Sequence, residues 1–244
     1  MSNIVVIPTY NEKENVEKLV RAIFDLPVSF DIMIIDDNSP DGTAEVVKTL
    51  QSEFDNLYLI EREGKLGLGT AYLAGFKWAI ARGYSYVYEM DADFSHNPKD
   101  LVKLFNACHE GGADLAIGSR YVSGVTVADW PLSRIFMSYI ASIYVRTITG
   151  MKIMDTTAGF KCYKREVLEN IIPYKIRSIG YGFQIEMKFI AWKLRYKIVE
   201  IPIVFTDRKH GSSKMSGGIF NEAIWVVLRI KARSILSKYT RLNK

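Results

Sequence analysis

The segment Tyr88-Glu-Met-Asp-Ala-Asp-Phe-Ser-His96 joins an apolar run to two carboxylates, Asp91 and Asp93, that stand one residue apart. If the run 86–90 is a strand, alternate side chains project to the same side, and both carboxylates converge on one point at its end. Mg2+ and Mn2+ prefer oxygen ligands, and Mg2+ usually takes one or two protein carboxylates and completes its shell with water and substrate phosphate. The pair therefore predicts a metal that carries a diphosphate. The same pattern also caps turns, so the neighbouring segments must decide.

Four other apolar runs have the length of buried strands, and they are residues 3–8, 31–37, 57–60 and 113–118. Between them lie stretches with helical spacing of apolar residues. Strands that alternate with helices through residues 1–120 predict an α/β fold, in which a mostly parallel sheet is the middle of three layers. The acids and glycines gather after the strands. Open α/β sheets bind ligands at that edge.

A glycine-rich passage, Gly64-Lys-Leu-Gly-Leu-Gly-Thr-Ala-Tyr72, opens the helix that we expect to continue to about Arg82. Glycines let a backbone approach a ligand, and a helix N-terminus favours anions. The passage matches neither the phosphate-loop pattern nor the dinucleotide fingerprint. A mononucleotide or sugar-phosphate contact and a packing loop therefore both remain open.

The second half of the chain contains two segments with amphipathic helical patterns, 131–150 and 219–236. Each pattern suits either a core-facing helix or a helix that lies in a membrane interface. A polar, basic stretch at 207–214 precedes the second segment. No uncharged apolar run reaches the roughly 18 residues that a spanning helix needs.

Composition favours one sizeable core, so we expect residues 1–244 to form a single domain. From residue 193 onward, twelve Lys and Arg face three Asp and Glu, and this basic end suits an anionic partner such as a membrane surface, a phosphate or a nucleic acid. Cys108 and Cys162 lie far apart without a metal-binding pattern, which predicts two reduced thiols in a cytosolic protein. The first residues run straight into a strand and do not read as a secretory leader.

Six motifs in order resemble the inverting family 2 glycosyltransferases with the Rossmann-like GT-A fold, and within them the dolichol (polyprenol) phosphate mannose synthases. The resemblance extends from Asn3 to about Lys231. The motifs are Pro8-Thr-Tyr-Asn-Glu12, Ile34-Ile-Asp-Asp37, Lys65-Leu-Gly-Leu-Gly69, Asp91-Ala-Asp93, Gly118-Ser-Arg120 and the segment from Asp207 to Lys214.

The resemblance implies a nucleotide-sugar site at the carboxyl ends of the strands. Residues implied to line the nucleotide pocket are Pro8, Tyr10, Glu12, Ile35 and Asp37, the last of which holds the base or ribose. Asp91 and Asp93 are implied to hold Mg2+ or Mn2+, with Ala92 against the nucleotide. Ser95 stands at the third metal position, where some members have Gln, and this departure leaves the metal preference open.

Cationic residues are implied to bind phosphates, and they are Arg120, Arg208 and Lys214. We expect Asp93 and Arg120 to act in catalysis. Arg134, at the start of the segment 131–150, is a candidate second ligand for an acceptor phosphate beside Arg120. Asp155 either orients these cations or caps a turn.

The resemblance implies transfer of mannose from GDP-mannose to a polyprenyl or dolichyl monophosphate with inversion. An acceptor phosphate is already an anion and needs no strong general base, which agrees with three histidines that form no catalytic arrangement; we expect a structural role for His96. Departure of a nucleoside diphosphate builds negative charge that a divalent cation and arginines stabilise. Nothing in these residues separates guanine from uracil or mannose from glucose, so UDP-glucose is the alternative donor.

The lipid acceptor also predicts where the enzyme works, because exposing each CH2 of a polyprenyl chain to water costs about 0.8 kcal/mol. We expect the two amphipathic helices and the basic C-terminal region to dock on the cytoplasmic face of a membrane, either peripherally or through a small membrane subunit. A nucleic-acid-binding or scaffold protein is the alternative from another class. Aromatic and basic residues are not interleaved as such a surface needs, so we expect no nucleic-acid partner.

Overall fold

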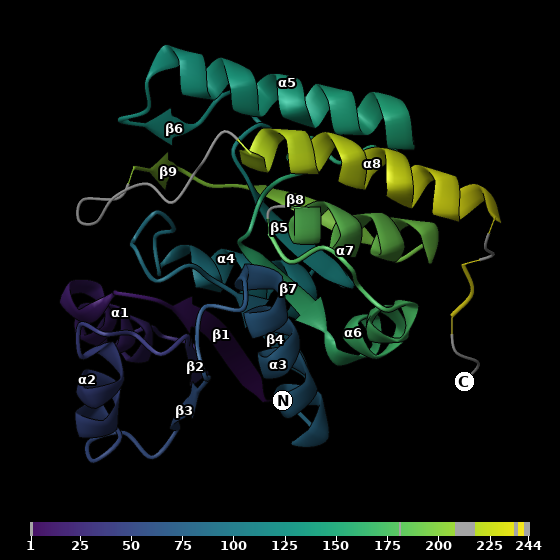
Figure 1. Ribbon diagram of the computed structural model, residues 1–244. Coiled ribbons are helices and arrows are strands. Elements are labelled where there is room, and N and C mark those ends of the chain that lie inside the picture. The colour runs from purple at the N-terminus through teal and green to yellow at the C-terminus, as the bar shows by residue number, and fades with distance from the viewer. Residues whose placement is uncertain (1, 181, 208–217, 237–238, 242–244) are drawn as a thin grey trace.

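Over the residues that the computed structural model describes, which are 2–180, 182–207, 218–236 and 239–241, a seven-stranded sheet runs through the middle of the protein (Figure 1). Its strands are β1 (Asn3–Thr9), β2 (Asp31–Asp36), β3 (Leu57–Glu61), β4 (Tyr86–Glu89), β5 (Leu115–Ser119), β7 (Lys161–Lys164) and β8 (Ile198–Pro202). They lie in the order β3-β2-β1-β4-β7-β5-β8, and β7 is antiparallel to both of its neighbours. A small parallel sheet pairs β6 (Val127–Ala128) with β9 (Phe205–Thr206).

Helices cover both faces of the large sheet, because side chains of the buried strands alternate between two cores. Val5 and Ile7 pack with α1 (Lys13–Phe24), α2 (Thr43–Leu50) and α4 (Asp100–His109). Ile4 and Val6 face the other core, which is built with α3 (Leu68–Ala81), α6 (Arg165–Ile171) and α7 (Gly182–Lys193). A short 3-10 helix, Ile172–Tyr174, extends α6. The predicted three-layer α/β fold with a mostly parallel sheet is confirmed.

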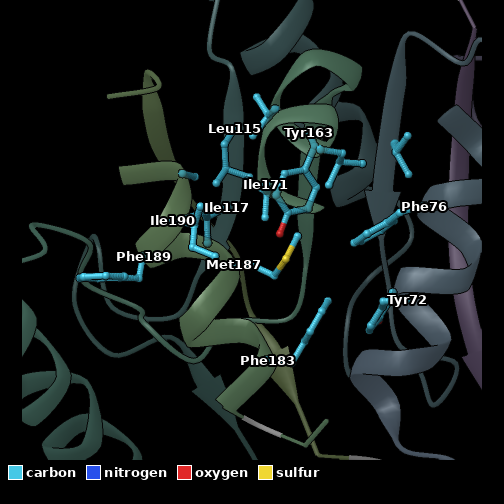
Figure 2. Close-up of a cluster of buried hydrophobic side chains, with 14 of the residues drawn as sticks. Tyr72, Phe76, Leu115, Ile117, Tyr163, Ile171, Phe183, Met187, Phe189 and Ile190 are labelled. Atoms are coloured by element: carbon cyan, nitrogen blue, oxygen red, sulfur yellow. The ribbon is translucent and has the colours of Figure 1, made fainter. Parts of the chain in front are cut away.

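Aromatic side chains join α3 to α7 across the second core, as Figure 2 shows. The rings of Tyr72 and Phe183 stack with their centroids 6.0 Å apart, and Phe76 meets Tyr163 of β7 edge-on at 5.7 Å. Every residue of α7 from Gly182 to Ala191 is buried. Helix α7 is therefore held rigidly against α3 and the sheet, close to the end of β4.

The strand order reverses between β1 and β4, since β1 leads through α1 to β2 on one side and β3 leads through α3 to β4 on the other. Such a switch point is where open α/β sheets bind ligands. The segments that leave β1 and β4 there begin with Tyr10 and carry the Asp91–Asp93 pair. The topology therefore places two of the sequence motifs side by side.

Two long helices, α5 (Leu132–Thr149) and α8 (Gly218–Leu236), lie next to each other on the α7 side of the molecule (Figure 1). Only Ser142, Val145 and Thr149 of α5 are buried. Large apolar side chains of α5 are exposed instead, and they are Leu132, Phe136, Met137, Ile140 and Ile143. Helix α5 therefore packs on the core along one side and keeps apolar side chains exposed elsewhere, and its extent agrees with the helical segment predicted over 131–150.

Other boundaries depart from the sequence-based expectations in small ways. The strand expected over 113–118 is β5, which covers Leu115–Ser119, and β7 was not predicted. Helix α4 begins at Asp100, after a turn in which the Asn97 side chain accepts a hydrogen bond from the Lys99 backbone N–H. Cys108 and Cys162 are buried free thiols, in agreement with the predicted absence of a disulfide.

Candidate active site

The loop after β4 fixes its two carboxylates through short local contacts. Asp91 keeps 37% of its side chain exposed, and its Oδ1 accepts a hydrogen bond from the Tyr72 hydroxyl at 3.2 Å. Asp93 is buried, and its Oδ1 accepts the Ser95 backbone N–H at 3.1 Å. Phe94, which lies between Asp93 and Ser95, has a φ of +59°, in the left-handed region that few side chains adopt. This tight turn fixes the buried Asp93 two residues after the exposed Asp91.

His96 supports the same loop from below. Its Nδ1 accepts the backbone N–H of Asp91 at 3.3 Å, and its ring stacks on Phe160 with centroids 4.9 Å apart. Burial lowers the pKa of His96 to about 4, with the nearby Asp93 charge opposing that shift. A neutral imidazole that accepts a backbone N–H orients the loop, as the structural role expected for His96 requires.

The donor set of this loop fits a hard divalent cation. Two carboxylates one residue apart are the usual protein share for Mg2+, which takes its other ligands from water and substrate phosphate. Asp91 and Asp93 would hold the ion, and the buried Ser95 lies in the same turn. Within the described ranges, no group of three or more His, Cys, Asp and Glu side chains is arranged to hold a metal.

The two acids at the end of β2 have different surroundings. Asp36 is 1% exposed and accepts hydrogen bonds from the hydroxyls of Thr9, at 2.7 Å, and Ser39, at 2.6 Å. Asp37 forms an ion pair with Arg62, whose Nε donates to its Oδ1 at 2.6 Å. Burial raises the pKa of Asp37, and Arg62 opposes the shift. Asp36 therefore ties β1 to β2, and the Asp37–Arg62 pair stands at the start of the adjoining loop.

The remaining residues predicted for the nucleotide pocket occupy different depths. Pro8, Tyr10 and Glu12 are half-buried where β1 leads into α1, and the Lys65 ammonium lies 4.9 Å from the Tyr10 ring centroid. Ala92 is buried within the loop 91–96 that follows β4. Ile35 is fully buried in the core beneath α3. Its side chain packs inward because successive strand residues face opposite sides, and its contact with a nucleotide stays a prediction.

Two glycines of the passage 64–72, Gly67 and Gly69, serve packing. A Cβ on Gly69 would lie 2.8 Å from the Phe183 ring and from the Ser178 carbonyl oxygen, and one on Gly67 would lie 3.1 Å from the Ile179 carbonyl oxygen. Gly67 also has a φ of +96°. These glycines let α3 start directly against the segment before α7, which favours the packing interpretation for them.

Arg120, at the end of β5, is locked to Asp155. Its Nε and Nη2 each donate to a different carboxylate oxygen of Asp155 at 2.7 Å, and Nη2 also donates to the Thr157 hydroxyl at 2.7 Å. The side chains are 9% and 0% exposed. Burial alone would raise the pKa of Asp155, but the Arg120 charge and hydrogen bonds lower it. Of the two roles open for Asp155, orientation of a cation is the one that the structure supports.

An aromatic cluster brings Arg120 and Arg134 together. The Arg134 guanidinium lies 4.0 Å from the Trp130 ring centroid, and that of Arg120 lies 5.5 Å from the same ring. Phe205 packs edge-on against both Trp130 and His96. Arg134 also pairs with Asp207 at 2.9 Å. Trp130 and Phe205 thus connect the two arginines predicted to hold an acceptor phosphate to His96, at the end of the loop 91–96. Arg208 and Lys214 lie outside the described residues.

Several side chains of the site were missed at the sequence level. Arg62 immediately follows β3, where a cation opposite the acids of β2 could have been noticed. Tyr72 and Gln184 lie within apolar helical patterns that gave no sign of their positions. Lys161 is fully buried against Glu89 at 3.0 Å, and only the unexpected strand β7 places it there.

Comparison with solved structures shows what fold the chain shares with other proteins. Glucosyl-3-phosphoglycerate synthase from Mycobacterium tuberculosis superposes with a TM-score of 0.69, 17% identity, and coverage of 95% of this chain and 80% of that one. A mannosyltransferase from Pyrobaculum calidifontis, in complex with GDP-Man and Mn2+, superposes with a TM-score of 0.61 and 16% identity, and the match covers 96% of this chain and 64% of that one. These similarities establish a fold that glycosyltransferases share.

Sequence comparison then identifies the family. Residues 4–172 match the family model described as glycosyl transferase family 2. A polyprenol monophosphomannose synthase of Mycolicibacterium smegmatis is 45% identical over 96% of this chain and 89% of its own length. An undecaprenyl-phosphate mannosyltransferase of Micrococcus luteus is 43% identical over 94% of this chain and 93% of its own length. The chain belongs to glycosyl transferase family 2.

Proposed function

We propose that this protein transfers mannose from GDP-mannose to a polyprenyl monophosphate. The observation that carries the proposal is 45% identity, over 96% of the chain, to a relative named polyprenol monophosphomannose synthase. The site agrees with it, since paired acids for a diphosphate-bound cation lie at the switch point and two arginines lie nearby.

The chemistry is a single displacement at the anomeric carbon. An acceptor phosphate oxygen forms a bond to this carbon while the bond to the GDP oxygen breaks, and the configuration inverts. Asp91 and Asp93 would hold Mg2+ or Mn2+, which when bound supplies positive charge to the leaving diphosphate. The acceptor brings its own negative charge, so the protein needs to position it more than to deprotonate it.

Arg120 and Arg134 are our candidates for positioning the acceptor phosphate. A guanidinium carries five N–H donors, so Arg120 can keep Asp155 as its partner and still contact a phosphate. Asp155 would hold the guanidinium plane fixed through its two-point contact. Arg134, whose pair with Asp207 is partly exposed, would exchange that partner for the phosphate more readily.

A lipid acceptor also gives a role to the outer surface of α5 and α8, where exposed apolar side chains gather. Searching the described residues finds no helix with the length and apolar character needed to cross a bilayer. We infer peripheral docking of this surface on the cytoplasmic face of a membrane, with the basic C-terminal region facing anionic lipids. A small membrane subunit is the alternative partner for the same surface.

Calorimetric titration with GDP, GDP-mannose, UDP and UDP-glucose tests the donor, each with Mg2+, Mn2+ or EDTA. Metal-dependent binding of the guanosine compounds alone is the expected result. Preference for the uridine compounds would replace the donor, and binding of none of them would overturn the proposal. Formation of a labelled mannolipid from polyprenyl phosphate in detergent micelles then tests the acceptor.

A further inference from the structure

Gln184 is a buried amide on α7 whose orientation is fixed by a lysine. The residue is 2% exposed, and its Oε1 accepts a hydrogen bond from the Lys161 ammonium. Lys161 itself has no exposed side-chain surface and lies 3.0 Å from Glu89. An ammonium group only donates hydrogen bonds, so the amide oxygen must face Lys161 and the amide nitrogen must face away.

The nitrogen at the other end of this amide lacks a partner. Within the described part of the chain, Nε2 of Gln184 is shielded from solvent and has no hydrogen-bond acceptor. A buried N–H donor without an acceptor costs about 1–3 kcal/mol, so native proteins rarely keep one unless something else satisfies it. The amide therefore points to an acceptor that the chain itself does not provide.

Gly159 stands where such an acceptor would lie, beside Asp91 in the loop 91–96. A Cβ placed on Gly159 would lie 3.4 Å from Nε2 of Gln184 and 3.9 Å from Oδ2 of Asp91. Both polar atoms therefore lie near the place that a side chain at residue 159 would occupy, and glycine leaves that place unfilled. An oxygen atom there would be close to the Gln184 donor and to the carboxylate of Asp91.

The strand order tells which part of a nucleotide sugar would reach this space. The predicted nucleotide contacts lie after β1 and β2, the Asp91–Asp93 pair follows β4, and Gln184 contacts β7 on the far side of β4. A donor whose diphosphate lies at the acid pair extends its sugar away from the nucleotide, toward β7. The amide is neutral, which suits a sugar hydroxyl better than a phosphate, for which the site has arginines.

We propose that Gln184 donates a hydrogen bond from Nε2 to a hydroxyl oxygen of the transferred sugar, in the space that Gly159 leaves open beside Asp91. This inference rests on the proposed function as a nucleotide-sugar transferase and assigns the contact that distinguishes the sugar-bearing donor from the bare diphosphate. Lys161 and Glu89 are positioning residues, because they act only through the orientation of the amide.

Titration of full-length variants with GDP and with GDP-mannose, both in Mn2+, tests the contact. Gln184→Met removes the donor without adding charge, and Gly159→Ala fills the space with a methyl group whose contacts in the protein, at 3.4–3.9 Å, are ordinary. Each variant should bind GDP-mannose about tenfold more weakly and GDP within about twofold of wild type, since GDP lacks the sugar. Gln51→Met is the matched control, because the Gln51 side-chain amide donates to the Leu57 carbonyl oxygen, away from the site.

Either equal losses for the two ligands or unchanged affinity for both would overturn the sugar contact. Gly159→Ala keeps the test decisive if Gln184→Met fails to fold, since it leaves the Lys161 contact intact. If wild type binds a different nucleotide sugar, the comparison is made with that sugar nucleotide and its diphosphate. If wild type binds no nucleotide at all, the proposed function fails first, and the inference falls with it.

Discussion

Arg120 and Asp155 show how one ion pair sets the geometry of a functional residue. Removing both charges from water is costly, and the cost is recovered only when the contact is two-pointed and other groups are satisfied. Glu200 meets the second requirement, because its carboxylate accepts the backbone N–H groups of Met154 and Asp155 at 2.7 and 2.9 Å. Asp155 is thus fixed before it fixes Arg120.

Asp155→Ala should destabilise the protein strongly, because it leaves the buried Arg120 charge without a partner. Breaking a buried pair typically costs about 3–5 kcal/mol of unfolding free energy, whereas solvent screens the exposed pair of Arg21 and Glu53, so breaking that pair should cost much less. Urea denaturation of Asp155→Ala and the control Arg21→Ala measures the difference. Similar costs for the two variants would show that the Arg120–Asp155 pair is not stabilising.

The buried His96 predicts a loss of stability in mild acid. Its pKa is about 4 in the folded protein and about 6.5 when unfolded, so between these values the unfolded chain binds more protons. The free energy of unfolding should therefore fall as the pH drops from about 6.5 to about 4, by roughly 3 kcal/mol at about 1.4 kcal/mol per pH unit.

Urea unfolding of wild type and His96→Asn across this pH range measures the effect. The Asn side-chain oxygen can still accept the Asp91 backbone N–H, but it does not titrate, so the decline should flatten. His109→Asn is the control. Burial also lowers the pKa of His109, but this histidine is only partly buried, unlike His96. A decline as steep in His96→Asn as in wild type would assign the acid sensitivity to other groups.

At the scale of elements, helix α3 determines where Tyr72 meets Asp91. The helix lies close to the sheet at Gly75, where a Cβ would stand 2.4 Å from a methyl group of Val6 in β1. Since Val6 is fully buried in a central strand, it has little room to yield. A single glycine thus sets the depth at which α3 packs.

Gly75→Ala should destabilise the protein although alanine is the better helix former. Helix propensity alone would favour alanine by about 1 kcal/mol, but overpacking a filled core costs about 1–3 kcal/mol. Thermal or urea unfolding should give a net loss that adding Val6→Ala to this variant partly reverses. Gly64→Ala, whose Cβ would meet nothing within 4 Å, is the control. No loss in Gly75→Ala would mean that α3 adjusts freely.

The regular elements of the first 120 residues could be predicted because each reports itself locally, through continuous apolar runs or helical spacing. Strand β7 could not, since Lys161-Cys-Tyr-Lys164 is short and alternates little. Its Lys161 is buried only because Glu89 of the neighbouring strand pairs with it. From the sequence alone, a lysine is expected at the protein surface. The burial of Lys161 depends on the register between β4 and β7, which places it opposite Glu89.

At the scale of the whole molecule, contacts between distant segments account for the rest of the site. The acid pair and Arg120 were predicted from motifs, but the pairing of Arg120 with Asp155 joins residues 35 positions apart, and the Lys161–Gln184 contact joins residues 23 apart. No local pattern specifies either distance. A motif likewise does not tell which face of a strand each residue takes, so the burial of the Ile35 side chain was not predicted.

The outer surface of α5 and α8 presents a further property of the whole molecule. Phe136, Met137 and Ile140 of α5 and Trp225 and Leu228 of α8 are all exposed. The two helices are in contact, and the Tyr144 hydroxyl of α5 donates to the Ile224 carbonyl oxygen of α8 at 3.4 Å. A paired apolar surface of this kind suits insertion into the headgroup region of a bilayer.

A Phe136→Gln/Ile140→Gln variant should bind anionic lipid vesicles at least about tenfold more weakly, because two exposed apolar side chains no longer insert. Its unfolding free energy should stay close to that of wild type, since the side chains are 66% and 41% exposed. Co-sedimentation with vesicles of mixed neutral and anionic lipid, at low and high salt, measures the binding. Leu66→Gln, which changes a similarly exposed apolar residue outside both helices, is the control and should bind as wild type does. If the double variant bound as wild type does and only high salt reduced binding, the basic C-terminal region would account for docking. That result would contradict a role for α5.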